Sequence, residues 1–292
     1  MKLLSFISFT PPGIKYQPRA FLFRGIASLL ALIALAEPAG AVLVDDASYQ
    51  TTAPTSASVP NWDVGWSQSG VTGWDYVGAV GGASGVYLGN GWVITAAHVN
   101  LSSGTYTLNG TTYAIVAEST VSPGSADLTM FRISSEPQLP ALSISSSAPI
   151  SFSTQVVMIG YGGGAKSWGV NTVTATHVQV TVSAYTSTDF ATAYGTPSSQ
   201  GRNRMTVINS AEAVPGDSGG GAFAYNSASG TWSLVGLIEA VDSNGDTYFV
   251  QLGSYSTFIS QTMYSSVPEP ALPALLLPVA CFALWRLRHR RY

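Results

Sequence analysis

Residues 213–221 read AVPGDSGGG, and this short stretch does most to decide the fold of the chain. Asp217 stands directly before Ser218, and glycines lie on both sides of the pair. Glycine weakens strands and helices, so a cluster of glycines indicates a tight turn or a close approach to another group. A serine on such a turn becomes a nucleophile only when a base accepts its proton. The stretch therefore predicts either a plain turn or a nucleophile with a distant base.

Histidine accepts a proton readily near neutral pH, and the chain has 3 histidines. His98 ends the stretch GWVITAAHV (91–99), where an apolar strand runs into small residues and can hold a rigid base at the edge of a cleft. His177 begins a strand-like stretch, and no motif near it indicates a catalytic partner. His289 lies in a basic C-terminal tail. His98 is therefore the candidate base.

A buried carboxylate usually orients such a histidine and stabilises its charged form. Asp127 opens the apolar stretch DLTMFRI (127–133), where a lone carboxylate is costly without a partner. Asp75 and Asp189 stand in more polar or aromatic surroundings. Asp127 is the first candidate for the acid, although it could instead cap a turn.

The order of these residues along the chain separates the possible folds. Residues 216–220 match the G-x-S-x-G elbow of α/β-hydrolases, in which the acid and the histidine follow the serine. Here only His289 follows Ser218, and helical patterns are scarce. The subtilisin order places the acid first, and its surrounding motifs are absent. The order His98, Asp127, Ser218 is that of chymotrypsin.

At these residues the chain resembles the trypsin/chymotrypsin-like serine proteases. The motifs are TAAH (95–98) and GDSGG (216–220), with DLTMFRI between them. Two further stretches, VVMIGYGGG (156–164) and TWSLVGLIEA (231–240), resemble later strands of that family. The resemblance covers roughly residues 73–262.

This resemblance implies an all-β fold of two six-stranded antiparallel barrels, with the active site between them. The first barrel is expected at about 73–140 and the second at about 150–262. His98 and Asp127 come from the first barrel and Ser218 from the second. The backbone N–H groups of Gly216 and Ser218 form the oxyanion hole, and the reaction passes through an acyl-enzyme.

The strand pattern agrees with this fold, because short stretches rich in β-branched and aromatic residues alternate with turn residues. Asn109-Gly110 predicts a hairpin turn, and 136–149 predicts a connector between two β halves. GYGGG (160–164) predicts a bend, since neither Lys-Ser/Thr nor a helix follows it as in a phosphate loop. Short helices are possible at 95–100 and 255–264. Strands are expected at 85–98, 104–120, 127–134, 154–162, 177–187, 204–210, 231–241 and 247–253.

The chain also departs from the family. Regulated members begin with an Ile-Val-Gly-Gly-like sequence, whose amino group pairs with the acid before the serine, and no such start stands about forty residues before His98. Asp217 therefore needs another partner, either Arg202, Arg204 or backbone N–H groups. We expect a protein starting at Val42 to be active without internal cleavage.

Substrate preference stays open between two alternatives. Glu212 lies six residues before Ser218, where the trypsin group places an acid that binds Arg or Lys. Val241 and Thr247 align with positions that narrow the pocket for small apolar side chains. Glu239 is also expected among the substrate-binding residues. It stands where the family has a serine that supports the triad acid, so its carboxylate repels Asp127 unless it is protonated or turned away.

Composition excludes other classes. Of 292 residues, 9% are charged and 46% hydrophobic, which is typical of a globular chain. Between 42 and 266 there are four Lys or Arg and thirteen Asp or Glu, a net charge of −9, so nucleic acid is not an expected partner. The only cysteine is Cys281, so the exported domain has no disulfide and no thiol chemistry. No metal motif is present, and no cofactor is required.

Both ends of the chain read as targeting segments. Residues 1–41 predict a signal peptide, with an apolar run before Ala39-Gly40-Ala41, where signal peptidase would cut. Residues 267–292 begin Val-Pro-Glu-Pro and end in an arginine cluster, and they resemble the PEP-CTERM sorting signal of Gram-negative bacteria. That resemblance implies an exosortase-like partner and export to the cell surface, the outer membrane or the medium. The apolar run 271–285 is marginal as a transmembrane helix.

Two functions are consistent with the sequence of the central domain, 42–266. The first is a secreted serine endopeptidase that acts on protein or peptide substrates. The alternative is a catalytically inactive protease-fold protein with a binding or structural role in the cell envelope.

Overall fold

The structure, a computed structural model, describes residues 41–44, 49–194 and 210–265. All of them belong to one compact unit of the chain. The expected signal peptide and sorting segment lie outside these residues apart from Ala41, and so do Arg202, Arg204 and the strand expected at 204–210 apart from Ser210. Within the described ranges no helix is long and apolar enough to cross a membrane, and the run 271–285 lies outside them.

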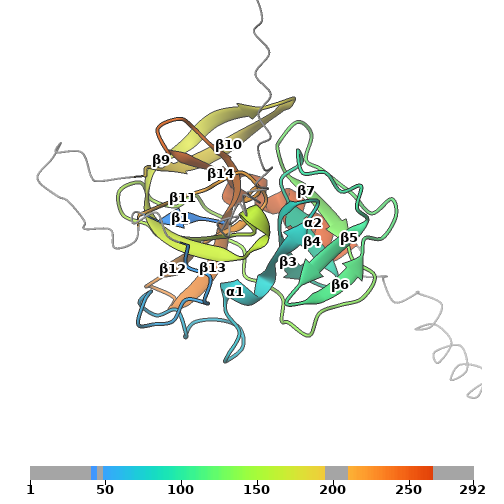
Figure 1. The fold of residues 1–292 in the computed structure, drawn as a ribbon, viewed down its shortest axis with the longest axis horizontal. Helices are drawn as coiled ribbons and strands as arrows, with labels where there is room; N and C mark the ends of the chain where they lie inside the picture. The colour runs from blue at the N-terminus through green and yellow to red at the C-terminus, as the bar shows by residue number, and fades with distance from the viewer. Residues whose placement is uncertain (1–40, 45–48, 195–209, 266–292) are drawn as a thin grey trace, which may run out of the picture. The chain divides into compact units, whose positions relative to one another are not determined.

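The first barrel is a six-stranded antiparallel sheet in the order β6-β5-β2-β3-β4-β7 (Figure 1). Its two edge strands meet where Ile115 pairs with Ile133 and the Val116 N–H donates to the Arg132 carbonyl at 2.8 Å, which closes the sheet on itself. The strands are β2 (Val77–Val80), β3 (Ala83–Gly89), β4 (Trp92–Thr95), β5 (Thr105–Leu108), β6 (Thr111–Ala114) and β7 (Thr129–Arg132).

The second barrel is closed by regular pairing in the order β10-β14-β13-β12-β8-β9. All its strand pairs are antiparallel. The prediction of two six-stranded antiparallel barrels is therefore confirmed. The strands are β8 (Gln155–Gly160), β9 (Ser167–Val182), β10 (Tyr185–Thr192), β12 (Gly221–Asn226), β13 (Thr231–Val241) and β14 (Thr247–Gln251).

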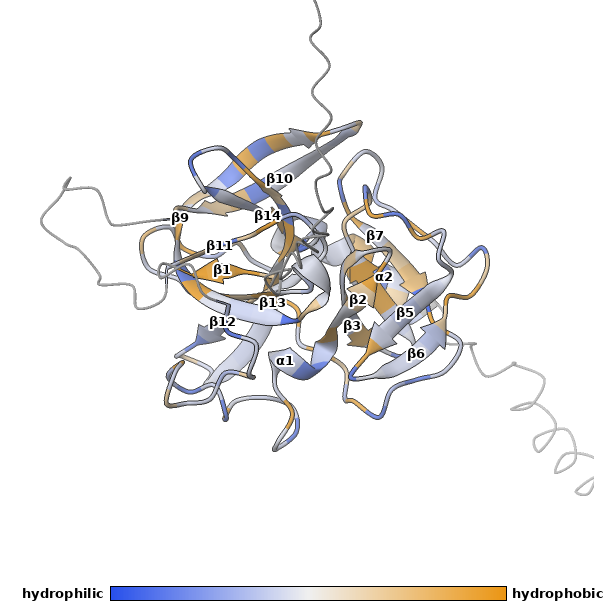
Figure 2. Ribbon diagram, in the orientation of Figure 1, coloured by the Kyte–Doolittle hydropathy of each residue, from blue (hydrophilic) through white to orange (hydrophobic). Residues whose placement is uncertain are grey.

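The apolar core explains why these stretches form strands. All four residues of β4 are buried, so the strand reads as a continuous apolar run. One apolar cluster extends from Phe131 in the first barrel to Leu237 in the second. A second cluster fills the second barrel, where Phe190 stacks on Phe249 with ring centroids 4.7 Å apart. Figure 2 shows apolar residues concentrated on the strands of the first barrel, with mixed or hydrophilic loops around them.

Both ends of the described chain pack onto a barrel. At the N-terminal end, β1 (Leu43–Val44) pairs with β11 (Ala211–Glu212) in a two-stranded sheet that contacts β9 of the second barrel, and Trp66 stacks on Trp232. At the C-terminal end, α2 (Ser256–Ser265) borders a hollow that Asn90 and Leu142 also line. Three short helical segments complete the fold: α1 (Gly73–Tyr76), η1 (Gly162–Gly164) and η2 (Leu252–Tyr255).

The sequence predictions were wrong at some elements. The stretch 177–187 is not one strand but a hairpin that turns at Ser183, where φ is +53°, and β9 begins earlier, at Ser167. Strands β2 and β12 were not expected, and no helix forms at 95–100. The hairpin at Asn109-Gly110 and a helix near 255–264 are confirmed. The connector 136–149 runs between β7 and β8 without a helix or strand.

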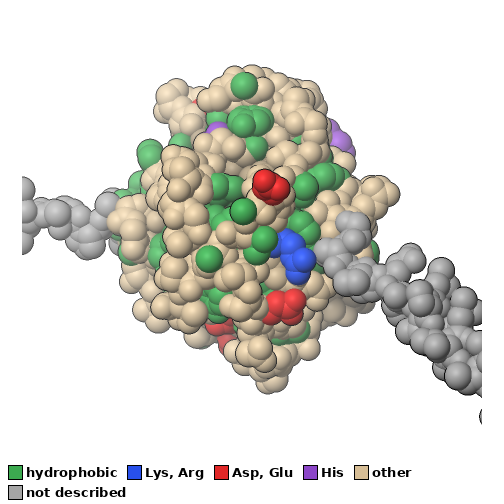
Figure 3. All heavy atoms as spheres, turned by 90° about the vertical axis from the view of Figure 1, so that its right-hand side faces the viewer, with side chains coloured by type: hydrophobic (Ala, Val, Ile, Leu, Met, Phe, Trp, Pro, Cys, Tyr) green, Lys and Arg blue, Asp and Glu red, His purple; other side chains and the backbone are tan. Residues whose placement is uncertain are grey.

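The surface carries few charges. Figure 3, which faces the first barrel, shows isolated acidic and basic side chains among uncharged ones and no basic patch on this face.

Candidate active site

Three side chains predicted to act together form one row of hydrogen bonds. The Ser218 hydroxyl lies 2.9 Å from His98 Nε2, and His98 Nδ1 lies 2.5 Å from Asp127 Oδ2. In the arrangement that suits a nucleophile, Ser218 donates to Nε2 and the Nδ1–H donates to the carboxylate. The row crosses from the first barrel, which carries His98 and Asp127, to the second, which carries Ser218.

The first barrel fixes the histidine by its backbone as well as its ring. β4 ends at Thr95, whose hydroxyl donates to the Ser84 carbonyl at 2.6 Å, and the chain then turns. The His98 N–H donates to Asp127 Oδ1 at 2.8 Å, so the same carboxylate holds both the main chain and the ring. Asp127 is fully buried, whereas the His98 side chain is 24% exposed. The histidine therefore faces solvent on the side from which a substrate can approach.

The backbone around Ser218 leaves two N–H donors available. Strand β3 binds the carbonyls of this loop: Ser84 N–H donates to the Ser218 carbonyl at 2.9 Å, and the Ser84 hydroxyl donates to the Gly216 carbonyl at 3.2 Å. Within the described residues, the N–H groups of Gly216 and Ser218 meet no acceptor. Gly216 has φ +99°, a conformation that strongly favours glycine. These two N–H groups are the ones expected to form an oxyanion hole.

Asp217 finds its partners in the backbone. Its carboxylate is fully buried and accepts from the N–H groups of Gly162 at 2.9 Å and Val214 at 2.8 Å. Burial raises the pKa of Asp217 to about 7, and the two N–H donors oppose this rise. Of the three partners considered from the sequence, the structure shows backbone N–H groups.

The GYGGG stretch has a role that sequence reasoning missed. A Cβ at Gly160 would overlap the Asp217 carboxylate, and a Cβ at Gly162 would come within 2.9 Å of Oδ1. The glycines therefore clear space for a buried carboxylate and supply one of its donors. Repeated glycine directly after an apolar strand was the available signal, but nothing in it named Asp217 as the partner.

Three of the four residues expected to bind substrate lie together. Val241 pairs with Thr247 across β13 and β14, and the Ala213 N–H donates to the Thr247 hydroxyl at 3.0 Å. Glu212 precedes Ala213 on the same stretch, and its carboxylate reaches Gly245, which lies between Val241 and Thr247 in sequence. Partial burial raises the pKa of Glu212.

Glu239 does not belong with them, which corrects the expectation that it binds substrate. Its side chain is 2% exposed, and it faces Asp189 beneath the site. Asp189, ranked below Asp127 as the triad acid, thus lies near that acid without touching His98.

Two other candidates lie apart from the row. Asp75 accepts from the Thr72 N–H at 2.8 Å and caps α1. His177 is exposed on β9 and contacts the Thr176 hydroxyl. Among the described residues no three His, Cys, Asp or Glu side chains converge to hold a metal ion.

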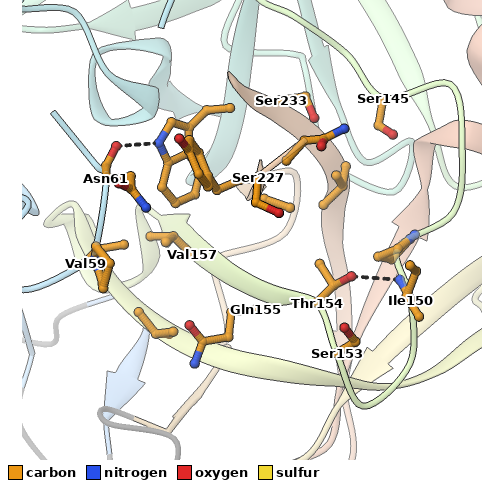
Figure 4. A pocket seen from close by; sticks show the side chains of 18 of the residues that line it. Val59, Asn61, Ser145, Ile150, Ser153, Thr154, Gln155, Val157, Ser227 and Ser233 are labelled. Carbon is orange, nitrogen blue, oxygen red and sulfur yellow. Dashed lines mark hydrogen bonds between the residues drawn. The ribbon is translucent and has the colours of Figure 1, made fainter. Parts of the chain in front are cut away.

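A hollow of about 480 Å³ lies on the second barrel, away from the row (Figure 4). Neutral side chains line it, among them Asn61, Thr154 and Gln155, and no residue of the hydrogen-bonded row does. Its Trp232 ring already donates to the Asn61 carbonyl at 2.8 Å.

Comparison with known proteins agrees with the fold. A family model described as "Trypsin-like peptidase domain" matches residues 83–237, and the chain belongs to this family. The match spans His98, Asp127 and Ser218.

Solved structures share the fold at low identity. An inactive mutant of Rv3671c from M. tuberculosis H37Rv has a TM-score of 0.50 and 15% identity, covering 76% of this chain and 100% of that one. The NS6 protease of murine norovirus 1 has a TM-score of 0.45 and 16% identity, covering 61% and 90%. Comparison with curated proteins found no match.

Proposed function

We propose that this chain is a serine endopeptidase with Ser218 as its nucleophile. The observation that supports it is the hydrogen-bonded row from Ser218 through His98 to the buried Asp127. Serine needs a base within hydrogen-bonding reach, and that base needs a group that orients it. The row provides both within a trypsin-like peptidase domain.

In the first half of the reaction, Ser218 Oγ attacks the carbonyl carbon of the scissile peptide while His98 Nε2 takes the hydroxyl proton. The carbonyl oxygen becomes an oxyanion, which the N–H groups of Gly216 and Ser218 bind. One such donor is worth about 3 kcal/mol in the transition state. His98 then gives its proton to the leaving amine as the C–N bond breaks, leaving an acyl-enzyme.

In the second half, water attacks the acyl carbon while His98 Nε2 takes a proton from it. Collapse of the second oxyanion breaks the bond to Ser218 Oγ, which recovers its proton from His98. Asp127 keeps its negative charge throughout and stabilises the imidazolium that forms twice per cycle.

The test is covalent labelling of the full chain with a fluorophosphonate probe. We expect labelling of the wild type, loss in Ser218→Ala, and retention in Ser102→Ala, whose serine is exposed. Labelling should need no prior cleavage, because the Asp217 carboxylate already has its partners in the uncut chain. A well-folded wild type that stays unlabelled would favour the inactive binding protein instead.

Peptide substrates identify the side-chain preference. Glu212 as a substrate-binding acid would favour Arg or Lys before the scissile bond, whereas a site narrowed by Val241 and Thr247 would favour small apolar residues. Comparing kcat/KM for peptides ending in Arg, Ala and Phe decides between the two.

We also propose that the chain is exported and sorted, on the basis of its terminal sequences alone. Signal peptidase would remove residues 1–41, and an exosortase-like enzyme would process 267–292, placing the domain at the cell surface or outside it. Mass spectrometry of both termini of the protein recovered from cells tests this proposal; uncut ends contradict it.

A further inference from the structure

Two carboxyl groups are buried behind the triad acid in a setting that usually excludes charge. Asp189 on β10 is 0% exposed and Glu239 on β13 is 2% exposed. Apart from the Ser187 hydroxyl, which acts on Glu239, no N–H or hydroxyl group in the described chain donates to their four carboxyl oxygens. An ionised carboxylate without a donor is costly to bury. Both groups therefore need another way to be satisfied.

Each carboxyl finds that partner in the other. The two carboxyl groups lie within hydrogen-bonding reach of each other. Two carboxylates cannot form such a bond unless one oxygen carries a proton, because an ionised carboxylate only accepts. Burial raises the pKa of both groups, and the neighbouring carboxyl raises that of Glu239 further.

The strands are irregular at both residues. Strand β10 shifts its register against β9 between Asp189 and Phe190. Strand β13 shifts against β14 between Ile238 and Ala240, so Glu239 is the extra residue of a bulge. Bulges re-aim side chains and are frequent beside active sites. The inward direction of Glu239 thus follows from an irregularity in its strand.

Strand β10 connects the pair to the triad acid. Ser187 lies two residues before Asp189, so both face the same side of the strand. The Ser187 hydroxyl oxygen accepts from the Asp127 N–H at 2.8 Å. One residue earlier, the Thr186 N–H donates to the Ser125 carbonyl at 2.8 Å. The start of β10 therefore holds the loop that carries Asp127 at two points.

The charged surroundings of the pair are simple. Asp127 is the other charged group that acts on both carboxyls, and no cation in the described residues does so. The Ser187 hydroxyl acts against the rise in the pKa of Glu239. From β9, His177 is exposed and contacts Thr176, and from η2, the Tyr255 hydroxyl accepts from the Thr188 N–H.

We propose that Asp189 and Glu239 share one proton and act as positioning residues, holding Asp127 in place through Ser187. The proton lies between the two carboxyls, so the pair carries one negative charge instead of two. This inference rests on the proposed function, because it assigns a role within the same site. It also explains how a glutamate can occupy this position without repelling Asp127 out of the row.

Loss of the shared proton should disturb the site. In alkaline solution the pair would carry two charges next to Asp127, and like charges at short range repel strongly in a buried setting. Asp127 and β10 would then separate, and His98 would lose its orientation. We therefore expect a decline in reactivity on the alkaline side that belongs to the pair.

The experiment measures the rate of Ser218 labelling against pH in the full chain. Near neutral pH, Glu239→Gln should label within about threefold of wild type, because its amide donates to Asp189 and keeps one charge. In alkaline solution the wild type should slow by roughly tenfold or more, and Glu239→Gln should not. Glu136→Gln, the same change at an exposed position, should follow the wild type. A decline caused by another group would persist in both variants.

Superimposable pH profiles of wild type and Glu239→Gln would overturn the inference and leave the proposed function intact. If Glu239→Gln does not fold, Asp189→Asn carries the same measurement. A wild type unlabelled at every pH would instead contradict the proposed function.

Infrared spectroscopy tests for the shared proton directly. Infrared spectra at about pH 9, where Asp217 with its pKa of about 7 is ionised, should show the carbonyl band of a protonated carboxyl. The band should disappear in Glu239→Gln. Its absence from the wild type would refute the shared proton.

Discussion

At the scale of single residues, Asp217 shows how a buried charge is held by backbone groups alone within the described part of the chain. Two backbone N–H groups, from Gly162 and Val214, take the place of an ion pair. Burial raises the pKa of Asp217, and the two neutral donors offset this rise only in part. The loop before Ser218 therefore depends on a carboxylate that is close to protonation near neutral pH.

We expect Asp217→Asn to weaken this loop. The amide group offers one acceptor where the carboxylate offered two, so a buried N–H loses its partner at a cost of about 1–3 kcal/mol. Urea unfolding should show this loss, and Ser218 labelling should slow by roughly tenfold or more as the oxyanion donors lose their position. Unchanged labelling would show that the carboxylate does not shape the site.

We expect Gly160→Ala to act on the same carboxylate by steric overlap. The added Cβ would overlap Asp217, and overpacking of this kind costs about 1–3 kcal/mol. Gly85→Ala is the matched control, because its Cβ would meet movable methyl groups at 3.2 and 3.3 Å. The thermal midpoint should fall more for Gly160→Ala than for the control; equal shifts would contradict the role assigned to Gly160.

At the scale of elements, strand β3 of the first barrel binds the loop of the second barrel that carries Ser218. Ser84 uses its N–H on the Ser218 carbonyl and its hydroxyl on the Gly216 carbonyl, while its hydroxyl oxygen accepts from the Tyr161 N–H at 2.8 Å. One serine of the first barrel thus fixes two loops of the second. Its position on a strand, between residues paired on both sides, makes it a rigid support.

Removing the Ser84 hydroxyl tests this support. We expect Ser84→Ala to lower kcat by about tenfold with little change in KM, because the lost bonds position the oxyanion donors and do not bind substrate. Steady-state kinetics on the best peptide substrate measures both constants. Ser102→Ala, at an exposed position, should change neither; a rise in KM alone for Ser84→Ala would contradict this account.

The elements also show what the sequence could and could not predict. β4 and β7 are buried along most of their length, so their apolar runs identified them directly. The β9–β10 hairpin was misread as one strand, since its turn at Ser183 lacks glycine and its partly exposed strands alternate. Glu239 points inward as the extra residue of a bulge in β13, and the sequence gives no signal for that bulge.

At the scale of the whole molecule, the site is formed by residues 120 positions apart in sequence that hydrogen-bond across the two barrels. Chain order and short motifs were enough to predict which side chains would meet, because the order of these residues along the chain is a property of the fold. The pairing of Asp189 with Glu239 could not be predicted in this way, since it depends on the register of strands from separate parts of one barrel.

The buried acids should make folding stability depend on pH. Burial raises the pKa of Asp189 and of Asp217 to about 7. In the unfolded chain, the pKa of aspartate is about 3.9. Between these values the folded chain binds more protons, so stability is greatest at the acidic end and falls as pH rises toward 7. The slope is about 1.4 kcal/mol per pH unit for each extra proton bound.

Urea unfolding at several pH values between about 5 and 7 measures this slope. Asp189→Asn should reduce the slope, because one of the groups no longer titrates. A stability that rises over this range would contradict the assignment of buried, protonated acids.

The pairing of β1 with β11 has a consequence for the order of events during synthesis. Leu43 and Val44 leave the ribosome early, but their partners Glu212 and Ala211 follow about 170 residues later. The pair of β1 and β11 therefore forms only after most of the described domain has been made. A chain that ends before β11 also lacks Ser218, so the hydrogen-bonded row with His98 and Asp127 forms only after that point.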